Sequence, residues 1–309
     1  MALPNASKTR NFFANFLTFW IPIKIYRVCL RNIIKIGVFN YIKTIKAEKT
    51  TKFPTTLAIG AIMKNEGPYL KEWLDYHILV GVEKFYLYDN ESTDNTTEIL
   101  KPYIKKGIVE YNYIEGKSKQ YTAYVDILKK HSWDTKWIAL IDLDEFIVPV
   151  QHKTIPEFLS TLPKNCSNLV MTWVLYGSSG HETKPDGLVM ENYKNHRKKT
   201  SGVKSIINPR FVSEIKIHVC TVAGFIMDEN GKKLGRIDQT NNPPTISKIR
   251  VNHYVTKSRE EFEKRVKRGG GCNGPDSKSY QEKAKKFDWY NTDTVYDNIM
   301  DKYIAKLKK

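Results

Sequence analysis

The chain has 309 residues, of which 41% are hydrophobic, 12% aromatic and 27% charged. This is an ordinary globular composition, which excludes a disordered chain, a collagen-like repeat and a small disulfide scaffold. There are 50 Lys and Arg residues against 33 Asp and Glu, a net charge of +17, which predicts attraction to an anionic partner such as nucleic acid, a lipid surface or a phosphorylated substrate. The four cysteines form no C-x-x-C pair, so neither a zinc cluster nor a dense disulfide framework is indicated.

The positive charge is concentrated at the two ends of the chain. Residues 1–52 carry ten Lys and Arg against a single Glu, and residues 256–309 also carry an excess of basic residues. The middle, residues 53–255, is nearly neutral, which argues against nucleic acid as the partner. We therefore expect a basic amphipathic, membrane-associating extension over 1–52, a central domain over 53–255 and a helical extension over 256–309 that completes the site.

The first segment mixes aromatic and basic residues. Its apolar run, which includes Phe12, Phe16 and Trp20, is interrupted by Lys24 and Arg27 and is too short to span a bilayer. No small-residue cleavage site follows it, as a signal peptide would require. The pattern favours an interfacial helix on an anionic membrane surface. The alternatives are a helix packed on the chain's own domain and a misjudged membrane span.

Apolar strands and amphipathic helices alternate through the middle of the chain. The pattern predicts strands at 57–63, 84–88, 108–114 and 137–141, and helices at 68–80, 94–104 and 121–130. This alternation indicates an α/β sheet covered by helices on both faces.

Polar residues follow three of these strands, at the edge where such sheets bind ligands. They are Lys64-Asn65-Glu66, Asp89-Asn90 and Asp142-Leu143-Asp144-Glu145. In an extended segment Asp142 and Asp144 point the same way, so both carboxylates can face one cation. Carboxylate pairs that leave room for a diphosphate suit Mg²⁺ or Mn²⁺.

Two segments carry a family resemblance, "AIMKNEGPYLKEWLDYHILVGVEKFYLYDNESTDNT" and "WIALIDLDEFIVP". Together they resemble the nucleotide-sugar glycosyltransferases of the GT-A fold, most closely the family 92-like and family 2-like group of polysaccharide and lipopolysaccharide assembly. The resemblance covers about residues 55–270. It implies a GT-A, Rossmann-like mixed sheet flanked by helices as the catalytic domain, with the basic N-terminal and C-terminal helical extensions outside or beside it.

The resemblance also implies roles for individual residues. A divalent metal, Mn²⁺ or Mg²⁺, would be bound by Asp144 and Asp142, with His253 and His218 as further candidates. The residues expected to contact the nucleotide-sugar are Lys64, Asn65, Glu66, Asp89, Gln120, Asp142, Lys204, Lys257, Arg265 and Arg268. The two arginines precede Gly269-Gly270-Gly271, which could form a flexible lid over the diphosphate.

A Gly-Ser-rich loop after the acidic motif resembles an acceptor loop. Gly177 and His181 are its candidate acceptor-binding residues. An inverting transfer needs a carboxylate base to take the proton of the acceptor hydroxyl, and Glu182 and Asp186 are both available. The sequence does not choose between them.

The resulting hypothesis is a metal-dependent enzyme that moves a hexose from a UDP-sugar to a saccharide, with inversion. The expected acceptor is a lipid-linked saccharide, such as lipopolysaccharide or another surface glycan, and the expected location is cytoplasmic, peripheral on the inner face of the cell membrane. The alternatives are a haloacid-dehalogenase-like phosphatase and a non-catalytic membrane or nucleic-acid binding protein. The phosphatase motif expects Thr or Val where this chain has Phe146.

Overall fold

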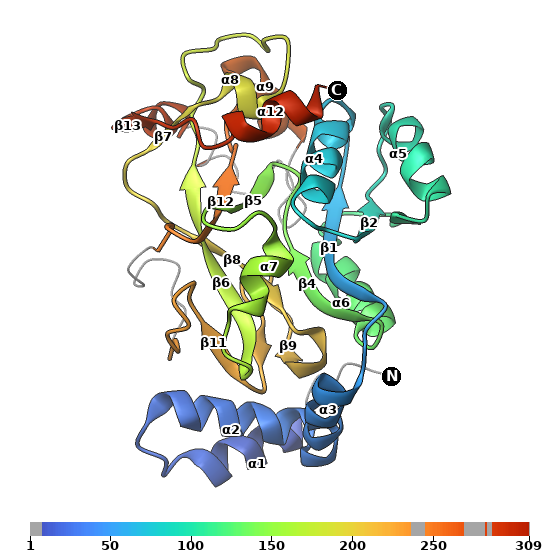
Figure 1. Ribbon diagram of the computed structural model, residues 1–309, viewed down its shortest axis with the longest axis vertical. Coiled ribbons are helices and arrows are strands. Elements are labelled where there is room, and N and C mark those ends of the chain that lie inside the picture. Colours follow the sequence, from blue (N-terminus) through green and yellow to red (C-terminus); the bar gives the residue numbers. More distant parts are fainter. Residues whose placement is uncertain (1–7, 236–244, 269–281, 283–285, 309) are drawn as a thin grey trace.

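The computed structural model describes residues 8–235, 245–268, 282 and 286–308 (Figure 1). Its helices are α1 Lys8–Thr18, α2 Lys24–Ile36, α3 Val38–Thr50, α4 Gly67–Leu79, α5 Thr96–Lys105, α6 Gln120–His131, α7 Ile155–Ser160, α8 Val189–Asn192, α9 Arg259–Arg268, α11 Phe287–Tyr290, α12 Asp301–Leu307 and the 3-10 helix η1 Pro209–Phe211. Its strands are β1 Thr55–Met63, β2 Lys84–Asp89, β3 Val109–Tyr113, β4 Thr135–Leu140, β5 Glu145–Pro149, β6 Cys166–Leu175, β7 Asn195–Arg197, β8 Val203–Ile207, β9 Val212–Glu214, β10 Thr221–Val222, β11 Phe225–Met227, β12 Ile249–His253 and β13 Thr294–Tyr296.

One mixed sheet forms the centre of the molecule, with strand order β3-β2-β1-β4-β8-β6-β12-β5 and β11 added beside β6. The first four strands in this order run parallel, whereas β8 is antiparallel to both of its neighbours, β4 and β6. Strand β12 is parallel to β6, and β5 is antiparallel to β12. The predicted fold class, an α/β mixed sheet flanked by helices, is confirmed.

Strand β1 is buried because both of its faces are covered by helices. All residues from Leu57 to Met63 are buried, which matches their uniform apolar character. Gly60 lies where α6 crosses the strand. A Cβ atom at this position would lie 2.9 Å from Ile127 Cδ1 and 3.0 Å from Leu140 Cδ2, so a larger residue would push α6 away from the sheet.

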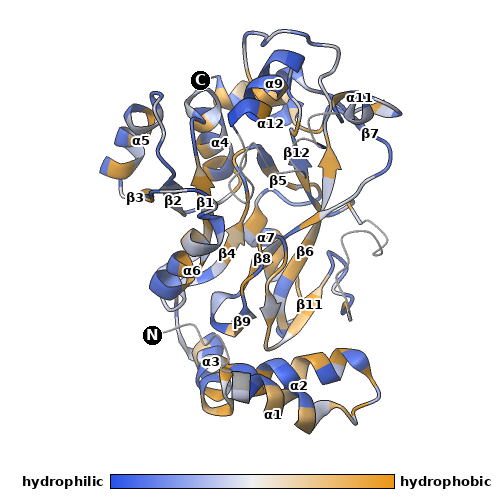
Figure 2. Cartoon of the chain, turned by 180° about the vertical axis from the view of Figure 1, so that it is seen from behind, coloured by the Kyte–Doolittle hydropathy of each residue, from blue (hydrophilic) through white to orange (hydrophobic). Residues whose placement is uncertain are grey.

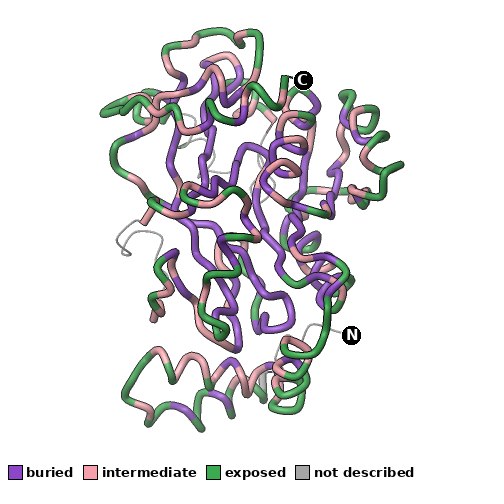
Figure 3. Tube along the Cα trace, in the orientation of Figure 1, coloured by how far each residue is buried: buried purple, intermediate pink, exposed green. Residues whose placement is uncertain are grey.

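Hydrophobic cores fill both sides of the sheet. One contains Trp73 and Tyr76 of α4 with Phe146 of β5, and the other contains Tyr124 and Ile127 of α6. Figure 3 shows the resulting buried strands at the centre, with the exposed stretches on the peripheral helices and loops.

The N-terminal helices pack on the end of the domain opposite α9 and α12 (Figure 1). Ser213 Oγ donates a hydrogen bond to Asn32 of α2 at 3.0 Å, and Arg210 Nη2 lies 2.6 Å from the Glu48 carboxylate of α3. Helices α2 and α3 are therefore docked on the chain's own domain, which was one of the alternatives considered for this segment.

Helix α1 carries a run of hydrophobic residues (Figure 2), several of which are exposed. The helix packs beside α2, and Phe12 and Phe16 of α1 and Trp20 in the turn after it are 60–67% exposed. Within the described residues, no helix is both long enough and apolar enough to cross a membrane.

The C-terminal residues fold back onto the central domain. Strand β13 pairs with β7, and Tyr303 of α12 packs edge-on against Tyr76 of α4 with ring centroids 5.1 Å apart. Asp297, between these two elements, forms an ion pair with Arg250 of β12. This segment, expected to be helical, thus also contributes a strand.

Candidate active site

The carboxyl ends of β1, β2 and β4 lie at one edge of the sheet, because the three strands are parallel neighbours. The loops after β1 and β2 are hydrogen-bonded to each other. Asn65 N donates to Ser92 Oγ at 2.9 Å, and Thr93 N donates to Asn65 Oδ1 at 2.7 Å. Asn65 has a φ of 53°, in the left-handed region that asparagine tolerates better than most residues. Its side chain shapes the loop that the sequence assigned to the nucleotide pocket.

Asp89 closes the second of these strands and is buried. One of its carboxylate oxygens accepts a hydrogen bond from Ser92 N at 2.9 Å, and the other accepts one from the Tyr111 hydroxyl at 2.9 Å. Both oxygens therefore hold the β2 loop and its neighbouring strand in position, at the place where the sequence predicts a contact with uracil or ribose.

The segment after β4 is a tight turn, in which Glu145 N donates to Asp142 O at 3.1 Å. The expectation of an extended segment with both aspartates facing one point is therefore wrong. Asp142 instead accepts hydrogen bonds from Gln120 Nε2 and Lys204 Nζ, each at 2.9 Å. Both carboxylate oxygens of Asp142 therefore accept a hydrogen bond from another side chain of the chain.

Lys204 of β8 is the fully buried counter-ion of this turn. Its Nζ also lies 3.5 Å from Glu145 Oε2. Burial alone lowers the pKa of Lys204, but the carboxylates of Asp142 and Glu145 outweigh it and raise this pKa well above its usual range. Burial likewise raises the pKa of Asp142, but Lys204 outweighs that effect and lowers it below its usual value. The sequence assigned Lys204 to phosphate, whereas the structure pairs it with the acidic turn.

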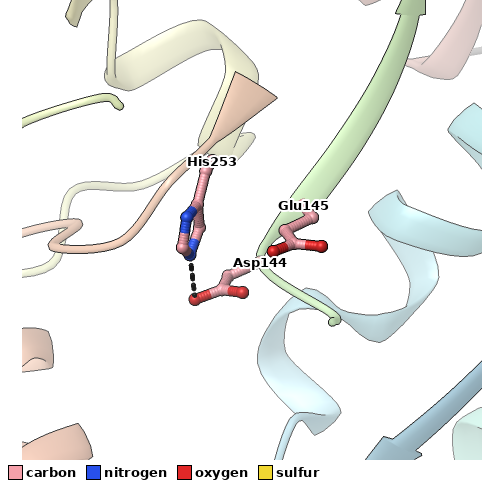
Figure 4. Close-up of side chains that lie close together, drawn as sticks. All are labelled: Asp144, Glu145 and His253. Carbon is pink, nitrogen blue, oxygen red and sulfur yellow. Dashed lines mark ion pairs between the residues drawn. The ribbon is translucent and has the colours of Figure 1, made fainter. Parts of the chain in front are cut away.

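Asp144 points toward His253 of β12 (Figure 4). Its Oδ2 lies 3.4 Å from His253 Nε2. The β5–β12 pairing explains this arrangement, because His253 lies directly opposite Glu145, and Tyr254 N donates to Asp144 O at 2.9 Å. Strands that are about a hundred residues apart in sequence therefore build this group.

Asp144, Glu145 and His253 fit a divalent cation. All three are buried, and each offers a ligand atom within 4.8 Å of the other two. Neither ring nitrogen of His253 has a hydrogen-bond partner among the described residues, and Glu145 Oε1 has none either. Buried polar atoms are rarely left in this state, and carboxylate oxygens with an imidazole nitrogen suit Mn²⁺ or Mg²⁺.

Two arginines of α9 cover this end of the sheet. Arg265 Nη2 lies 3.0 Å from Asp144 Oδ2, and Arg268 Nη2 lies 2.7 Å from Glu66 Oε1. Burial alone raises the pKa of Asp144, but the Arg265 guanidinium outweighs it and holds this pKa well below its usual range. The predicted glycine lid, residues 269–271, lies outside the described residues.

The two remaining lysines of the expected donor site have other neighbours. Lys64 Nζ lies 3.7 Å from Glu91 Oε2 at the surface. Lys257 is buried, and its ammonium group lies over the ring of Tyr69, 4.1 Å from the centroid.

His218, the fourth candidate metal ligand, lies outside the Asp144 group. Its ring packs edge-on against Trp173 with centroids 5.2 Å apart, and His253 contacts the same indole at 4.7 Å. His218 is therefore a neighbour of Trp173, while the ligand group of the described residues consists of Asp144, Glu145 and His253.

The expected acceptor loop is held against the C-terminal segment. A Cβ atom at Gly177 would lie 2.6 Å from Asn291 Oδ1, so glycine is required for this close approach. His181 packs edge-on against Tyr193. Glu182 is exposed and pairs with Arg259 Nε at 2.8 Å. Asp186 is also exposed.

The structure adds one residue to those expected from sequence, Glu145, which directly follows the two aspartates. The only signal for it was its place in the acidic run "DLDE". Its inward orientation depends on β5, a strand that the sequence pattern did not separate from the turn.

Comparisons with known proteins agree with the family resemblance of the two sequence segments. Residues 62–291, well over half of the chain, match Glycosyltransferase family 92. A family 92 protein of Oryza sativa is 24% identical over 67% of this chain and 34% of its own length, and one of Ricinus communis is 27% identical over 54% and 31%. A galactan beta-1,4-galactosyltransferase of Arabidopsis thaliana is 29% identical over 37% of this chain and 25% of its own. The chain thus spans about a third of the length of the curated relatives that it matches first.

Solved structures resemble the chain more distantly. The S. aureus protein TarS, residues 1–349, has a TM-score of 0.35 and 17% identity, covering 50% of this chain and 48% of that one. A glucosyl-3-phosphoglycerate synthase of Mycobacterium tuberculosis, solved with Mn²⁺ and UDP-glucose, has a TM-score of 0.28 and 16% identity, covering 43% and 48%.

The expected location, cytoplasmic and peripheral on the inner face of the cell membrane, is wrong. It followed from the likeness to enzymes of polysaccharide and lipopolysaccharide assembly. The curated relatives are plant proteins of family 92 and plant galactan galactosyltransferases instead.

Proposed function

Because the chain belongs to glycosyltransferase family 92, we propose that it transfers a hexose from a UDP-sugar to a hydroxyl group of a saccharide, with Mn²⁺ or Mg²⁺ as cofactor. The observation that carries this proposal is the buried group of Asp144, Glu145 and His253 at the carboxyl edge of the sheet. Family membership displaces the phosphatase and the non-catalytic binding protein as alternatives.

Asp144 and His253 would hold the metal, because their ligand atoms face each other and the imidazole nitrogens have no hydrogen-bond partner among the described residues. A bound cation would stabilise the negative charge that develops on the departing diphosphate. Asp142, neutralised by Lys204, keeps the turn in shape and so fixes the direction in which Asp144 points.

The donor would bind along the loops that follow β1 and β2. Asn65 and Asp89 hold these loops through their side-chain hydrogen bonds, which supports a preformed nucleotide pocket. Arg265 and Arg268 supply guanidinium groups at the same edge, and the forked geometry of arginine matches phosphate oxygens.

The acceptor would approach from the loop that contains Gly177 and His181. Inverting transfer needs a base, and Glu182 and Asp186 remain the candidates, with Glu182 restrained by its ion pair to Arg259. A lipid-linked saccharide, lipopolysaccharide and other surface glycans are the acceptor classes to test, together with galactan, on which a relative acts by name.

We also propose that α1 contacts an anionic lipid surface, without assigning that surface to a compartment. The exposed residues Phe12 and Phe16 of α1, with Trp20 in the turn after it, form an aromatic ridge, and the surrounding segment 1–52 is strongly basic. Exposed aromatic side chains flanked by basic residues are typical of interfacial helices. Helices α2 and α3 would connect this ridge rigidly to the domain.

The test of the enzymatic proposal is a panel of UDP-, GDP- and CMP-sugars, assayed for hydrolysis and transfer by wild type and Asp144→Asn. We expect turnover of one UDP-sugar by wild type and loss of at least about a hundredfold in the variant. Glu98→Gln, a surface substitution on α5, is the matched control and should retain full activity. Equal turnover by Asp144→Asn and wild type would overturn the assignment of this site.

A further inference from the structure

Asp144 Oδ2 has two partners, and one of them is already a cation. Arg265 Nη2 lies 3.0 Å from this oxygen, and His253 Nε2 lies 3.4 Å from it. The same carboxylate belongs to the group that fits a divalent metal. A carboxylate oxygen that faces a guanidinium cannot also ligate a metal at full strength, so the two cations compete for Asp144.

Helix α9, which carries Arg265, is firmly held at its start. Ser258 and Glu261 form a capping box, in which Glu261 N donates to Ser258 Oγ at 3.2 Å and Ser258 N donates to Glu261 Oε2 at 3.0 Å. The Glu261 carboxylate also accepts a hydrogen bond from the Tyr193 hydroxyl at 2.6 Å. The helix start is thus fixed to the domain, and Arg265 reaches Asp144 from the next turn.

The Arg265 side chain is more accessible than its partner. It is 33% exposed, whereas the Asp144 side chain is 9% exposed. The guanidinium therefore lies at the solvent side of the carboxylate. Its Nη1 also donates a hydrogen bond to Val255 O, so a rotation of the arginine side chain would break that bond and free Asp144 without moving α9.

Arg268, one turn later on α9, also forms an ion pair with an acidic residue at the sheet edge. Its guanidinium lies 2.7 Å from Glu66 Oε1 and donates to Asn65 O at 3.2 Å. Residues three apart lie on the same face of a helix, so both arginines face the sheet edge. Each is neutralised by an acidic residue that follows a different strand, Asp144 after β4 and Glu66 after β1.

We propose that Asp144 exchanges Arg265 for the divalent cation when donor binds, and that the released guanidinium binds the donor diphosphate. This inference rests on the proposed function. The exchange conserves charge, because the cation brings two positive charges and the diphosphate of a nucleotide-sugar brings two negative ones. Arg265 is then a donor-binding residue that weakens binding of metal alone and strengthens binding of metal together with nucleotide.

The test is Mn²⁺ binding by the full chain, followed by the electron paramagnetic resonance signal of free Mn²⁺, with and without UDP. Arg265→Gln should bind Mn²⁺ alone about tenfold more tightly than wild type, because the competing cation is gone. The same variant should bind UDP about tenfold more weakly in the presence of Mn²⁺. Lys264→Gln, on the exposed side of the same helix, should match wild type in both measurements.

Arg265→Lys, which keeps the charge, should bind Mn²⁺ alone as wild type does, and thermal unfolding of every variant checks that each is folded. Mn²⁺ affinity of Arg265→Gln equal to or below that of wild type would overturn the exchange while leaving metal-dependent transfer intact. Wild type that binds neither Mn²⁺ nor UDP would overturn the proposed function and the exchange together.

Discussion

Lys204 Nζ lies 2.9 Å from Asp142 Oδ2, and the lysine that makes this ion pair is fully buried. The same Nζ also lies 3.5 Å from Glu145 Oε2, so one ammonium group forms ion pairs with two carboxylates of the acidic turn. The turn that points Asp144 toward His253 therefore depends on a single positive charge supplied by β8.

Replacement of Lys204 by methionine should destabilise the protein by about 3 kcal/mol or more. Removing one partner of a buried ion pair leaves the other charge buried and uncompensated. Urea unfolding of Lys204→Met and of the exposed control Lys264→Met measures the difference. A variant as stable as wild type would contradict the role given to this lysine.

The strand and helix alternation between residues 55 and 140 follows closely from the sequence, because each element carries its own periodicity. The position of Lys204 does not follow from the sequence, because β8 lies antiparallel between β4 and β6. That pairing joins segments that are distant in the chain. The partnership of His253 with Asp144 depends in the same way on the β5–β12 register. The motifs indicated which residues to consider, whereas long-range pairing decides which of them meet.

The arrangement of the N-terminal segment also depends on contacts that its own sequence pattern does not specify. Its basic and aromatic residues fit both an interfacial helix and a helix packed on the domain. The structure docks α2 through Asn32 and α3 through Glu48, while leaving the aromatic ridge of α1 exposed. Residues 1–52 therefore do not behave as one unit, because α2 and α3 are docked on the domain while Phe12 and Phe16 of α1 are exposed.

Metal affinity should distinguish the two candidate histidines. His253→Phe keeps an aromatic ring against Trp173 but removes the nitrogen that faces Asp144, so we expect at least about a tenfold loss in Mn²⁺ affinity. His218→Phe alters the other ring packed on the same indole and should change Mn²⁺ affinity by less than about twofold. Calorimetric titration with Mn²⁺ measures both. Equal losses in the two variants would show that His218 also ligates the metal.

Glu72 should make the free energy of unfolding depend on pH. Its carboxylate accepts hydrogen bonds from Val189 N at 2.7 Å and Met190 N at 3.0 Å, at the start of α8. Burial nevertheless raises its pKa from 4.5 to about 7. The native state therefore keeps a proton that the unfolded state releases, so this residue's contribution to stability is full below pH 4.5 and is lost as the pH rises toward 7.

Glu72→Gln cannot ionise and should remove this part of the pH dependence. Urea unfolding of wild type and variant at pH 5 and pH 7.5 measures it, and the variant should lose less stability between these two values. An identical loss in both proteins would mean that Glu72 does not retain its proton on folding.

The aromatic ridge of α1 should determine binding to lipid. We expect wild type to sediment with vesicles of phosphatidylcholine and phosphatidylserine, and the Ser triple variant of Phe12, Phe16 and Trp20 to bind at least about tenfold more weakly. Ile104→Ser, an exposed apolar side chain of α5, is the matched control and should bind as wild type does.

Failure of wild type to bind these vesicles would contradict the lipid proposal. A triple variant that changes from dimer to monomer in sedimentation velocity, with vesicle binding unchanged, would also contradict it and assign the ridge to a second copy of the chain.

The most direct test of the central claim is a titration of metal-stripped enzyme with Mn²⁺ while UDP release from the donor sugar is measured. Wild type should be inactive in EDTA and should gain activity with saturable dependence on Mn²⁺, whereas Asp144→Asn should remain inactive at every concentration while retaining its fold. Full activity of wild type in EDTA would contradict a metal-dependent transferase built on Asp144 and His253.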